Sequence, residues 1–221
     1  MEFEKGGSLL DSIRNGKEYS KDEILRMIQD ITSGLCYLLS KGLMHRDIKP
    51  HNILISEEGR MKLCDFEFLK DIDHSTHSIT IGHPGYMAPE FNLQNGKYTE
   101  KIDIWSLGMT LLQILTKKGI MELSSHRNKY LEEIKEINKD IYDICELCLK
   151  ENPDERISAK DLNEHVHKIL SDFFRINVCL ITSTKGKILF SKFAKESSKI
   201  YEKDIEEQIS IILQQDVKVS L

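Results

Sequence analysis

His45-Arg46-Asp47-Ile48-Lys49-Pro50-His51-Asn52 is the most informative stretch of this sequence. It places a carboxylate, a cation and an amide on one short loop, at Asp47, Lys49 and Asn52. A phosphoryl transfer needs these three groups together. The carboxylate orients the attacking hydroxyl and accepts its proton, the cation neutralises charge on the transferred phosphate, and the amide oxygen holds a magnesium ion. The alternative is a polar loop whose charges are only solvated, and the sequence after the loop disfavours it.

The segments that follow the loop extend this pattern. Asn52–Ile55 is predicted to form a strand, Gly59-Arg60 the turn of a hairpin, and Met61–Cys64 the returning strand, which Asp65-Phe66 follows directly. Three further segments are Gly82-His83-Pro84-Gly85-Tyr86-Met87-Ala88-Pro89-Glu90, Asp103-Ile104-Trp105-Ser106-Leu107-Gly108 and Asn152-Pro153-Asp154-Glu155-Arg156. In their order and spacing these segments resemble the large (C-terminal) lobe of eukaryotic protein kinases of the serine/threonine type.

The resemblance to protein kinases covers residues 1–172 and implies roles for single residues. Asp47 matches the catalytic base, and Lys49 matches the lysine beside the transferring phosphate, in the arrangement typical of serine/threonine kinases. Asn52 and Asp65 match the magnesium ligands. The resemblance thus implies transfer of the γ-phosphoryl group of ATP to a serine or threonine hydroxyl of a protein substrate, with ATP and Mg²⁺ as cofactors. It also implies a buried ion pair between Glu90 and Arg156, and we expect Asp103 to accept hydrogen bonds from the backbone of the loop.

The nucleotide contacts of the family also have matching positions. Met1-Glu2-Phe3-Glu4 resembles the hinge strand between the two kinase lobes, and Gly6-Gly7-Ser8-Leu9 resembles the segment after it. Leu54 matches the residue that forms the floor of the adenine site. The nucleotide-binding residues implied in this way are Glu2, Glu4, Ser8, Lys49, Asn52, Leu54 and Asp65.

Several features of the family pattern are missing or altered. The glycine-rich loop, the strand lysine and the helix glutamate of the small lobe are not in this sequence, because the hinge-like segment begins at Met1. We therefore expect weak ATP binding, slow or absent turnover, and a partner that covers the exposed hinge side of the lobe. Glu67 stands where the family has a glycine, and His83 stands where it has a threonine that contacts the catalytic aspartate. The alternative functions are a pseudokinase and a kinase-lobe binding module.

The end of the chain, residues 173–221, differs in character. Residues 176–181 are predicted to form a strand, residues 184–187 a turn, residues 188–193 a returning strand, and residues 202–214 a helix. This hairpin followed by a helix resembles the start of the clathrin-adaptor small (sigma) chains, which have a longin-type α+β fold. The resemblance leaves three alternatives: a vesicle-trafficking adaptor fragment, a fusion through a gene-model error, and an extension specific to a kinase family.

Elsewhere the apolar pattern is mainly helical, so the fold class is predicted to be mainly α. Ser20 and Glu23 form a capping-box pattern at the start of a periodic helix that Gly42 ends, and residues 8–13 form a short helix before it. Later helices are predicted over residues 101–117, 127–137, 139–150 and 158–171. Cys145 and Cys148 fall within the third of these, and the interpretation as helix core is preferred over metal ligands.

Composition is that of an ordinary globular chain. The 221 residues are 40% hydrophobic and 30% charged, with a formal net charge of −5 that disfavours nucleic acid as a partner. No stretch reaches the ~20 apolar residues of a transmembrane helix. The five cysteines are irregularly spaced, which indicates reduced thiols and a cytoplasmic location.

Overall fold

The structure, a computed structural model, describes residues 6–71, 82–92 and 99–183. The chain divides into two units, residues 1–170 and 171–221, and each is described by itself. In the second unit only residues 171–183 are described. Glu2, Glu4, the predicted turn and second strand of the tail, and the tail helix lie outside the described residues.

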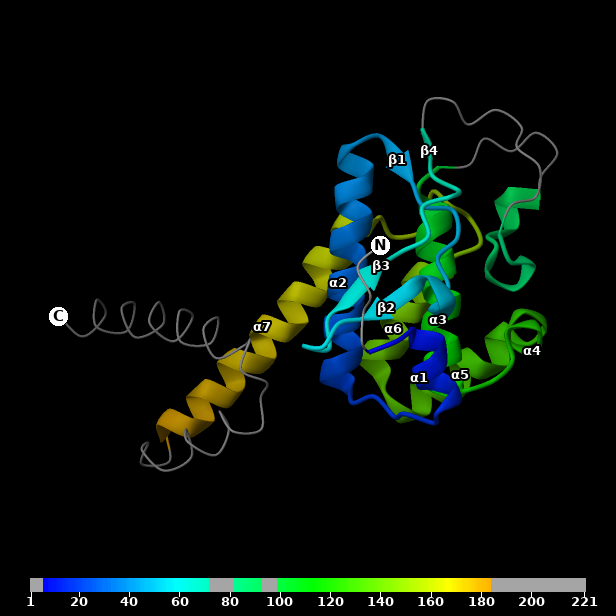
Figure 1. Ribbon diagram of the computed structural model, residues 1–221. Helices are drawn as coiled ribbons and strands as arrows, with labels where there is room; N and C mark the ends of the chain where they lie inside the picture. Colours follow the sequence, from blue (N-terminus) through cyan, green and yellow to red (C-terminus); the bar gives the residue numbers. More distant parts are fainter. Residues whose placement is uncertain (1–5, 72–81, 93–98, 184–221) are drawn as a thin grey trace. The chain divides into compact units, whose positions relative to one another are not determined.

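Helices dominate the described residues, which confirms a mainly α fold (Figure 1). The α-helices are α1 (Leu9–Arg14), α2 (Lys21–Ser40), α3 (Lys101–Thr116), α4 (Ile120–Ser125), α5 (Arg127–Ile137), α6 (Lys139–Cys148) and α7 (Ala159–Ser183). The strands are β1 (Leu43–Met44), β2 (Ile53–Ile55), β3 (Met61–Leu63) and β4 (Lys70–Asp71), and the short 3₁₀ helices are η1 (Pro50–Asn52), η3 (Pro84–Tyr86) and η4 (Pro89–Asn92).

Helix α3 is the centre of the first unit. Every residue from Ile102 to Ile114 is buried, because this helix is apolar around most of its circumference and other helices cover it on several sides (Figure 1). Gly108 lets α6 approach closely, since a Cβ there would lie 2.9 Å from the Cβ of Cys148. Cys145 and Cys148 are both fully buried, and burial raises the pKa of the Cys145 thiol to about 12. Their predicted place in the helix core is confirmed.

Helix α2 leads the chain into the loop at residues 45–52. Its predicted capping box is confirmed: Ser20 Oγ accepts the N–H of Glu23 at 3.2 Å, and the Glu23 carboxylate accepts the N–H of Ser20 at 2.8 Å. The helix ends at Ser40, and Gly42 follows with a φ of 72°, a left-handed conformation that glycine adopts without strain.

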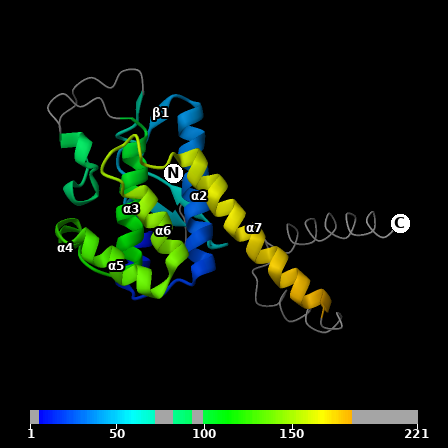
Figure 2. The same ribbon diagram turned by 180° about the vertical axis from the view of Figure 1, so that it is seen from behind.

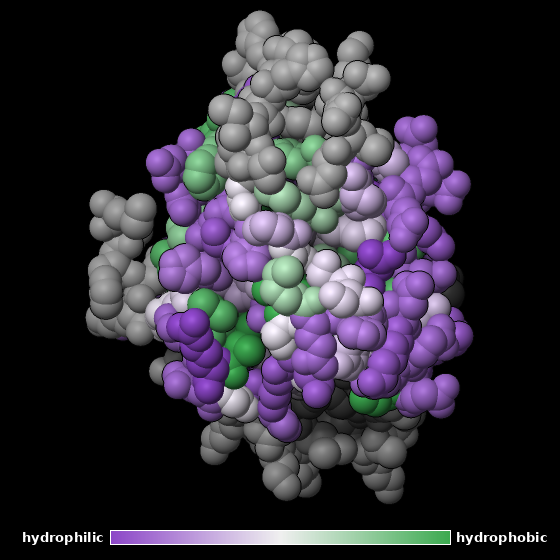
Figure 3. Space-filling model, turned by 90° about the vertical axis from the view of Figure 1, so that its right-hand side faces the viewer, coloured by the Kyte–Doolittle hydropathy of each residue, from purple (hydrophilic) through white to green (hydrophobic). Residues whose placement is uncertain are grey.

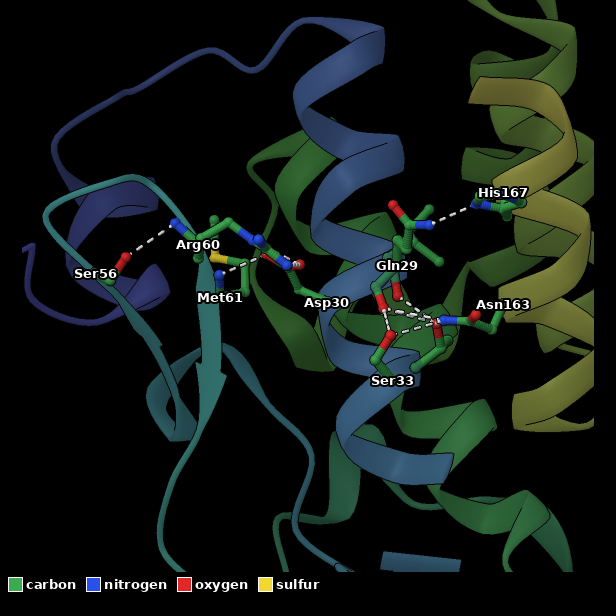
Figure 4. A network of polar contacts seen from close by, with 10 residues as sticks. Gln29, Asp30, Ser33, Ser56, Arg60, Met61, Asn163 and His167 are labelled. Carbon is green, nitrogen blue, oxygen red and sulfur yellow. Dashed lines mark hydrogen bonds and ion pairs between the residues drawn. The ribbon is translucent and has the colours of Figure 1, made fainter. Parts of the chain in front are cut away.

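The hairpin of β2 and β3 packs on α2 through a polar cluster (Figure 4). The predicted hairpin is confirmed, and its strands pair antiparallel with Leu54 opposite Lys62. Asp30 of α2 accepts two hydrogen bonds of 2.9 Å from Arg60 Nε and one of 2.9 Å from the backbone N–H of Met61. These bonds fix the hairpin, and therefore fix the loop that runs directly into β2.

A second polar cluster joins α2 to the first turns of α7, which lie beside α2 in both ribbon views (Figures 1 and 2). The Asn163 side chain donates to Gln29 O at 3.1 Å and to the Thr32 hydroxyl at 2.8 Å, and Gln29 also contacts His167 (Figure 4). Thr32 is fully buried, so this cluster holds α2 from the side opposite the hairpin.

The predicted strand over residues 176–181 is wrong. Helix α7 runs without interruption from Ala159 to Ser183 and therefore includes those residues. Its sequence contains neither glycine nor proline over this range, and the first glycine comes at Gly186. A short apolar run has no period of its own that separates strand from helix, so the helix already in progress continues through it.

Helix α4 and the strands β1 and β4 were not predicted. Helix α4, Ile120–Ser125, has only six residues, which are too few to show a period. Strands β1 and β4 pair antiparallel over two residues each, Leu43 with Asp71 and Met44 with Lys70. This pair attaches the segment after Asp65 to the start of the loop at residues 45–52.

The surface view in Figure 3 is mostly hydrophilic, with hydrophobic residues in small separate patches among the coloured residues. Among the residues that the structure describes, no helix combines the length and the apolarity needed to cross a membrane.

Candidate active site

The loop at residues 45–52 begins on a buried carboxylate of the central helix. Asp103 of α3, 3% exposed, accepts the backbone N–H of His45 at 2.8 Å and that of Arg46 at 2.7 Å. Burial raises the pKa of Asp103, while the backbone N–H groups of His45 and Arg46 and the charge of the Arg46 guanidinium act in the opposite direction. The predicted anchoring of the loop by Asp103 is confirmed.

Asp47, Lys49 and Asn52 meet within this loop. Lys49 Nζ lies 2.6 Å from Asp47 Oδ2, and Asn52 Nδ2 donates to the same oxygen at 2.7 Å and to Asp47 O at 2.9 Å. The turn η1 makes this possible, because Pro50 fixes its start and the N–H of Asn52 returns to Lys49 O at 2.9 Å. Asp47 is 4% exposed and Asn52 is 1% exposed, so these two side chains are protected from solvent.

Asp65 is brought to the same loop by the end of the hairpin. The preceding residue, Cys64, donates its N–H to Asn52 O at 3.0 Å, and its carbonyl oxygen lies 3.1 Å from His45 Nε2. Asp65 has a φ of 61°, in the left-handed region, and is half-buried. Phe66 stays 48% exposed with its ring centroid 5.4 Å from that of His45.

The donor groups at this site suit a magnesium ion. Because the Asn52 Nδ2 group faces Asp47, its amide oxygen remains for a cation, and Asp65 adds a carboxylate. Mg²⁺ prefers oxygen ligands and is commonly held by one or two carboxylates plus substrate phosphates. Within residues 6–71, 82–92 and 99–183 no three His, Cys, Asp or Glu side chains form a metal-binding group.

The predicted nucleotide contacts Ser8 and Leu54 lie side by side. They form an isolated antiparallel bridge, and Ile55 N–H donates to Gly7 O at 2.9 Å. The Ser8 hydroxyl caps α1: it accepts the N–H of Asp11 at 3.1 Å and donates to Asp11 Oδ2 at 2.5 Å. The hydroxyl is therefore already used, and Leu54, half-buried, is the residue that offers an apolar contact.

The segment at residues 82–90 is held against the central helix at two points. Ser106 of α3 donates to Tyr86 O at 2.8 Å, and the Tyr86 hydroxyl donates to the side-chain oxygen of Gln113. Burial raises the pKa of Tyr86, which keeps this hydroxyl a donor. Glu90 pairs with both terminal nitrogens of Arg156, at 2.6 and 2.9 Å, and the Arg156 side chain is 0% exposed. The predicted ion pair is confirmed.

The resemblance places His83 at the position of a threonine that contacts the catalytic aspartate. In the structure Gly82, rather than His83, lies against the loop that carries Asp47. His83 is exposed, and its Nδ1 accepts the N–H of Gly85 at 3.2 Å, so the imidazole caps η3. Gly82 instead faces the loop, since a Cβ on it would lie 3.5 Å from Asp47 Oδ1. Sequence reasoning missed this role of Gly82. The available signal was a glycine next to a turn, but a close approach to a distant loop leaves no local pattern.

Comparison with known proteins gives a consistent set of relatives. The family model described as protein kinase domain matches residues 1–168. The serine/threonine-protein kinase ppk11 of Schizosaccharomyces pombe is 34% identical over 177 residues, which cover 75% of this chain and 56% of that protein. The serine/threonine-protein kinase dst3 of Dictyostelium discoideum is 37% identical over 177 residues, covering 75% and 31%. Mitogen-activated protein kinase kinase kinase 3 of Arabidopsis thaliana is 33% identical over 175 residues, covering 75% and 29%. The chain thus spans less than two thirds of the length of these relatives.

Proposed function

The chain belongs to the protein kinase domain family, and from this premise we propose that it is a serine/threonine protein kinase that uses Mg²⁺ and ATP. The observation that supports the proposal most is the meeting of Asp47, Lys49 and Asn52 on one loop, with Asp65 attached beside it. The names of the relatives quoted above agree with the acceptor class.

In the proposed reaction Asp47 orients the hydroxyl of a serine or threonine side chain. The hydroxyl oxygen forms a bond to the γ-phosphorus of ATP while the bond from that phosphorus to the bridging oxygen breaks, and ADP leaves with the electron pair. The proton of the hydroxyl passes to Asp47. A bound magnesium ion would neutralise phosphate charge, held by the Asn52 amide oxygen and the Asp65 carboxylate.

Lys49 has two tasks in this proposal. Its ammonium group lies 2.6 Å from Asp47 Oδ2, so it keeps that oxygen occupied and orients the carboxylate. Its side chain is 22% exposed, so the same ammonium group remains accessible to a phosphate beside Asp47. Leu54 would contact the adenine ring from the β2 side.

The direct test is transfer of labelled γ-phosphate to a protein substrate, followed by identification of the labelled amino acid. The chain is assayed alone and also joined, ahead of residue 1, to the small lobe of a related kinase. Magnesium-dependent labelling of serine or threonine supports the proposal. Labelling confined to tyrosine, or no labelling in either form, contradicts it.

A kinase-lobe binding module is the second candidate, and Glu67 is the observation that favours it. This residue is exposed and follows Asp65-Phe66, so it adds a negative charge near the place where ATP phosphates would lie. If this charge weakens catalysis, Glu67→Gly should transfer phosphate faster than the unaltered chain, and Glu67→Gln should fall between them. Equal rates for all three proteins would remove this argument for a binding module.

A further inference from the structure

Gly82 occupies a position that is closed to other residues for two independent reasons. Its φ is 103°, a backbone conformation that residues with a side chain rarely adopt. In addition, a Cβ at this position would lie 3.2 Å from the carbonyl oxygen of Arg46, which is a tight approach, and 3.5 Å from Asp47 Oδ1, which is an ordinary contact distance. The bare backbone of Gly82 therefore lies directly against the loop that carries the proposed base.

The two carboxylate oxygens of Asp47 have different surroundings. Oδ2 is engaged twice, by Lys49 Nζ at 2.6 Å and by Asn52 Nδ2 at 2.7 Å. No hydrogen-bond donor from residues 6–71, 82–92 or 99–183 contacts Oδ1. Oδ1 is consequently the oxygen that remains to accept a proton, and it is the oxygen that Gly82 faces.

The segments around Gly82 are held by other contacts, so they cannot readily move to make room for a side chain at residue 82. The segment after it is fixed by Tyr86 on Ser106 and by Glu90 on Arg156. On the other side, Asp103 fixes the backbone of Arg46 at 2.7 Å. The carbonyl oxygen of Arg46 is the atom nearest to a Cβ at residue 82, and a shift there would be passed on to Asp47, the next residue in the chain.

We infer that Gly82 is a positioning residue of the proposed reaction: its missing side chain sets the position of the Asp47 carboxylate and keeps Oδ1 open to the acceptor hydroxyl. This inference rests on the proposed kinase function for its consequence, but the contact itself can be measured without catalysis. A Cβ at residue 82 would press on the carbonyl oxygen of Arg46, directly before Asp47, and side-chain atoms beyond the Cβ would crowd Oδ1.

Gly59 provides a matched control. It also has a left-handed backbone, with a φ of 79°, but a Cβ there would meet nothing within 4 Å. Asparagine tolerates left-handed conformations better than most residues. Gly82→Asn and Gly59→Asn therefore carry the same side chain on a backbone of positive φ, and they differ in whether a Cβ has neighbours in the loop at residues 45–52. Gly82→Ala repeats the measurement with the smallest side chain, in case the asparagine variant does not fold.

The test is the NMR spectrum of the side-chain amide of Asn52 in the full 221-residue chain. Because this amide donates to Asp47 Oδ2, its resonances report the position of the carboxylate. We expect them to shift in the folded Gly82 variants and to stay in place in Gly59→Asn. Unchanged resonances in a folded Gly82 variant would overturn the inference.

The steady-state kinetics of phosphate transfer give a second readout. They are measured with the chain alone or with the chain joined to a small lobe, whichever form transfers phosphate. The turnover number of the Gly82 variants should fall by on the order of 100-fold, as expected when a catalytic group is misplaced by about 1 Å, with the KM for ATP unchanged. A higher KM with an unchanged turnover number would contradict a positioning role. Asp47→Asn, measured in parallel, tests the proposed base separately: if it transfers phosphate normally, the role of Asp47 as base fails while the NMR result on Gly82 still stands.

Discussion

Two residues of the site keep left-handed backbones although they carry side chains, Arg46 with a φ of 67° and Asp65 with a φ of 61°. Such conformations cost roughly 1–3 kcal/mol each and persist where neighbouring contacts enforce them. Asp103 enforces the first through the N–H of Arg46, and the two hydrogen bonds of Cys64 hold the residue just before the second. The geometry of the site therefore depends on a few hydrogen bonds.

Removing the Asp103 carboxylate should release the loop. Asp103→Ala leaves the N–H groups of His45 and Arg46 buried without an acceptor, which typically costs about 1–3 kcal/mol for each group. We expect the free energy of unfolding, measured by urea denaturation, to fall by a few kcal/mol. The control is Asp143→Ala, which removes a carboxylate from an exposed ion pair on α6. Equal losses in both variants would mean that Asp103 does not anchor the loop.

The Glu90–Arg156 pair allows a buried ion pair to be compared with an exposed one. Arg156→Ala leaves the Glu90 carboxylate buried and unpaired, and breaking a buried pair in this way costs about 3–5 kcal/mol. Lys139→Ala breaks a pair on the surface, where the lysine side chain is 74% exposed, and should cost no more than about 1 kcal/mol. Denaturation curves of the two variants measure the difference. A loss below about 1 kcal/mol for Arg156→Ala is the result that would exclude a structural role for the pair.

Among single residues, the sequence predicted the contacts between groups that are close together in the chain. Asp47, Lys49 and Asn52 share one loop, so their meeting needs only a turn that Pro50 helps to start. The contact of Gly82 with Asp47 Oδ1 joins segments that are far apart, and it depends on the path of the whole chain. The capping bond that occupies the Ser8 hydroxyl could have been recognised, since Asp11 stands at the capping-box position.

Elements with a strong local signal were predicted well. The capping box of α2 and the hairpin of β2 and β3 both follow from side-chain chemistry or turn preference within a few residues. The pair of β1 and β4 has two residues in each strand, too few for an alternation to appear. The end of α7 was mistaken for a strand because its apolar residues fit either period.

The capping box of α1 should make stability depend on pH. Hydrogen bonds from the Ser8 hydroxyl and then from the Ser8 backbone hold the pKa of Asp11 below its usual range. A lowered pKa in the folded state stabilises the fold above the pKa of the unfolded chain, and this contribution is lost as the pH falls through the lower value. Melting temperatures of the unaltered chain and Asp11→Ala should thus differ at neutral pH and converge in acid. A difference that stays constant with pH would disprove the linkage.

For the molecule as a whole, the loop at residues 45–52 is fixed from several directions. Asp103 of α3 holds its start, the hairpin fixed on Asp30 continues from its end, and the segment at residues 82–90 lies against it at Gly82. These supports come from parts of the chain that are distant in sequence. They place a carboxylate, a cation and an amide together before any substrate arrives, which is the preorganisation that phosphoryl transfer requires.

The central claim is that Asp47 is the base of a phosphoryl transfer, and the rate of transfer by Asp47→Asn tests it most directly. Asparagine keeps the size of the side chain but removes its ability to take a proton. The rate of γ-phosphate transfer to a serine or threonine substrate is measured beside the unaltered protein, in the form that is active. We expect the rate to fall by roughly 10²–10⁴-fold, with the affinity for magnesium-ATP changed only slightly. Transfer at an undiminished rate by Asp47→Asn would contradict the account.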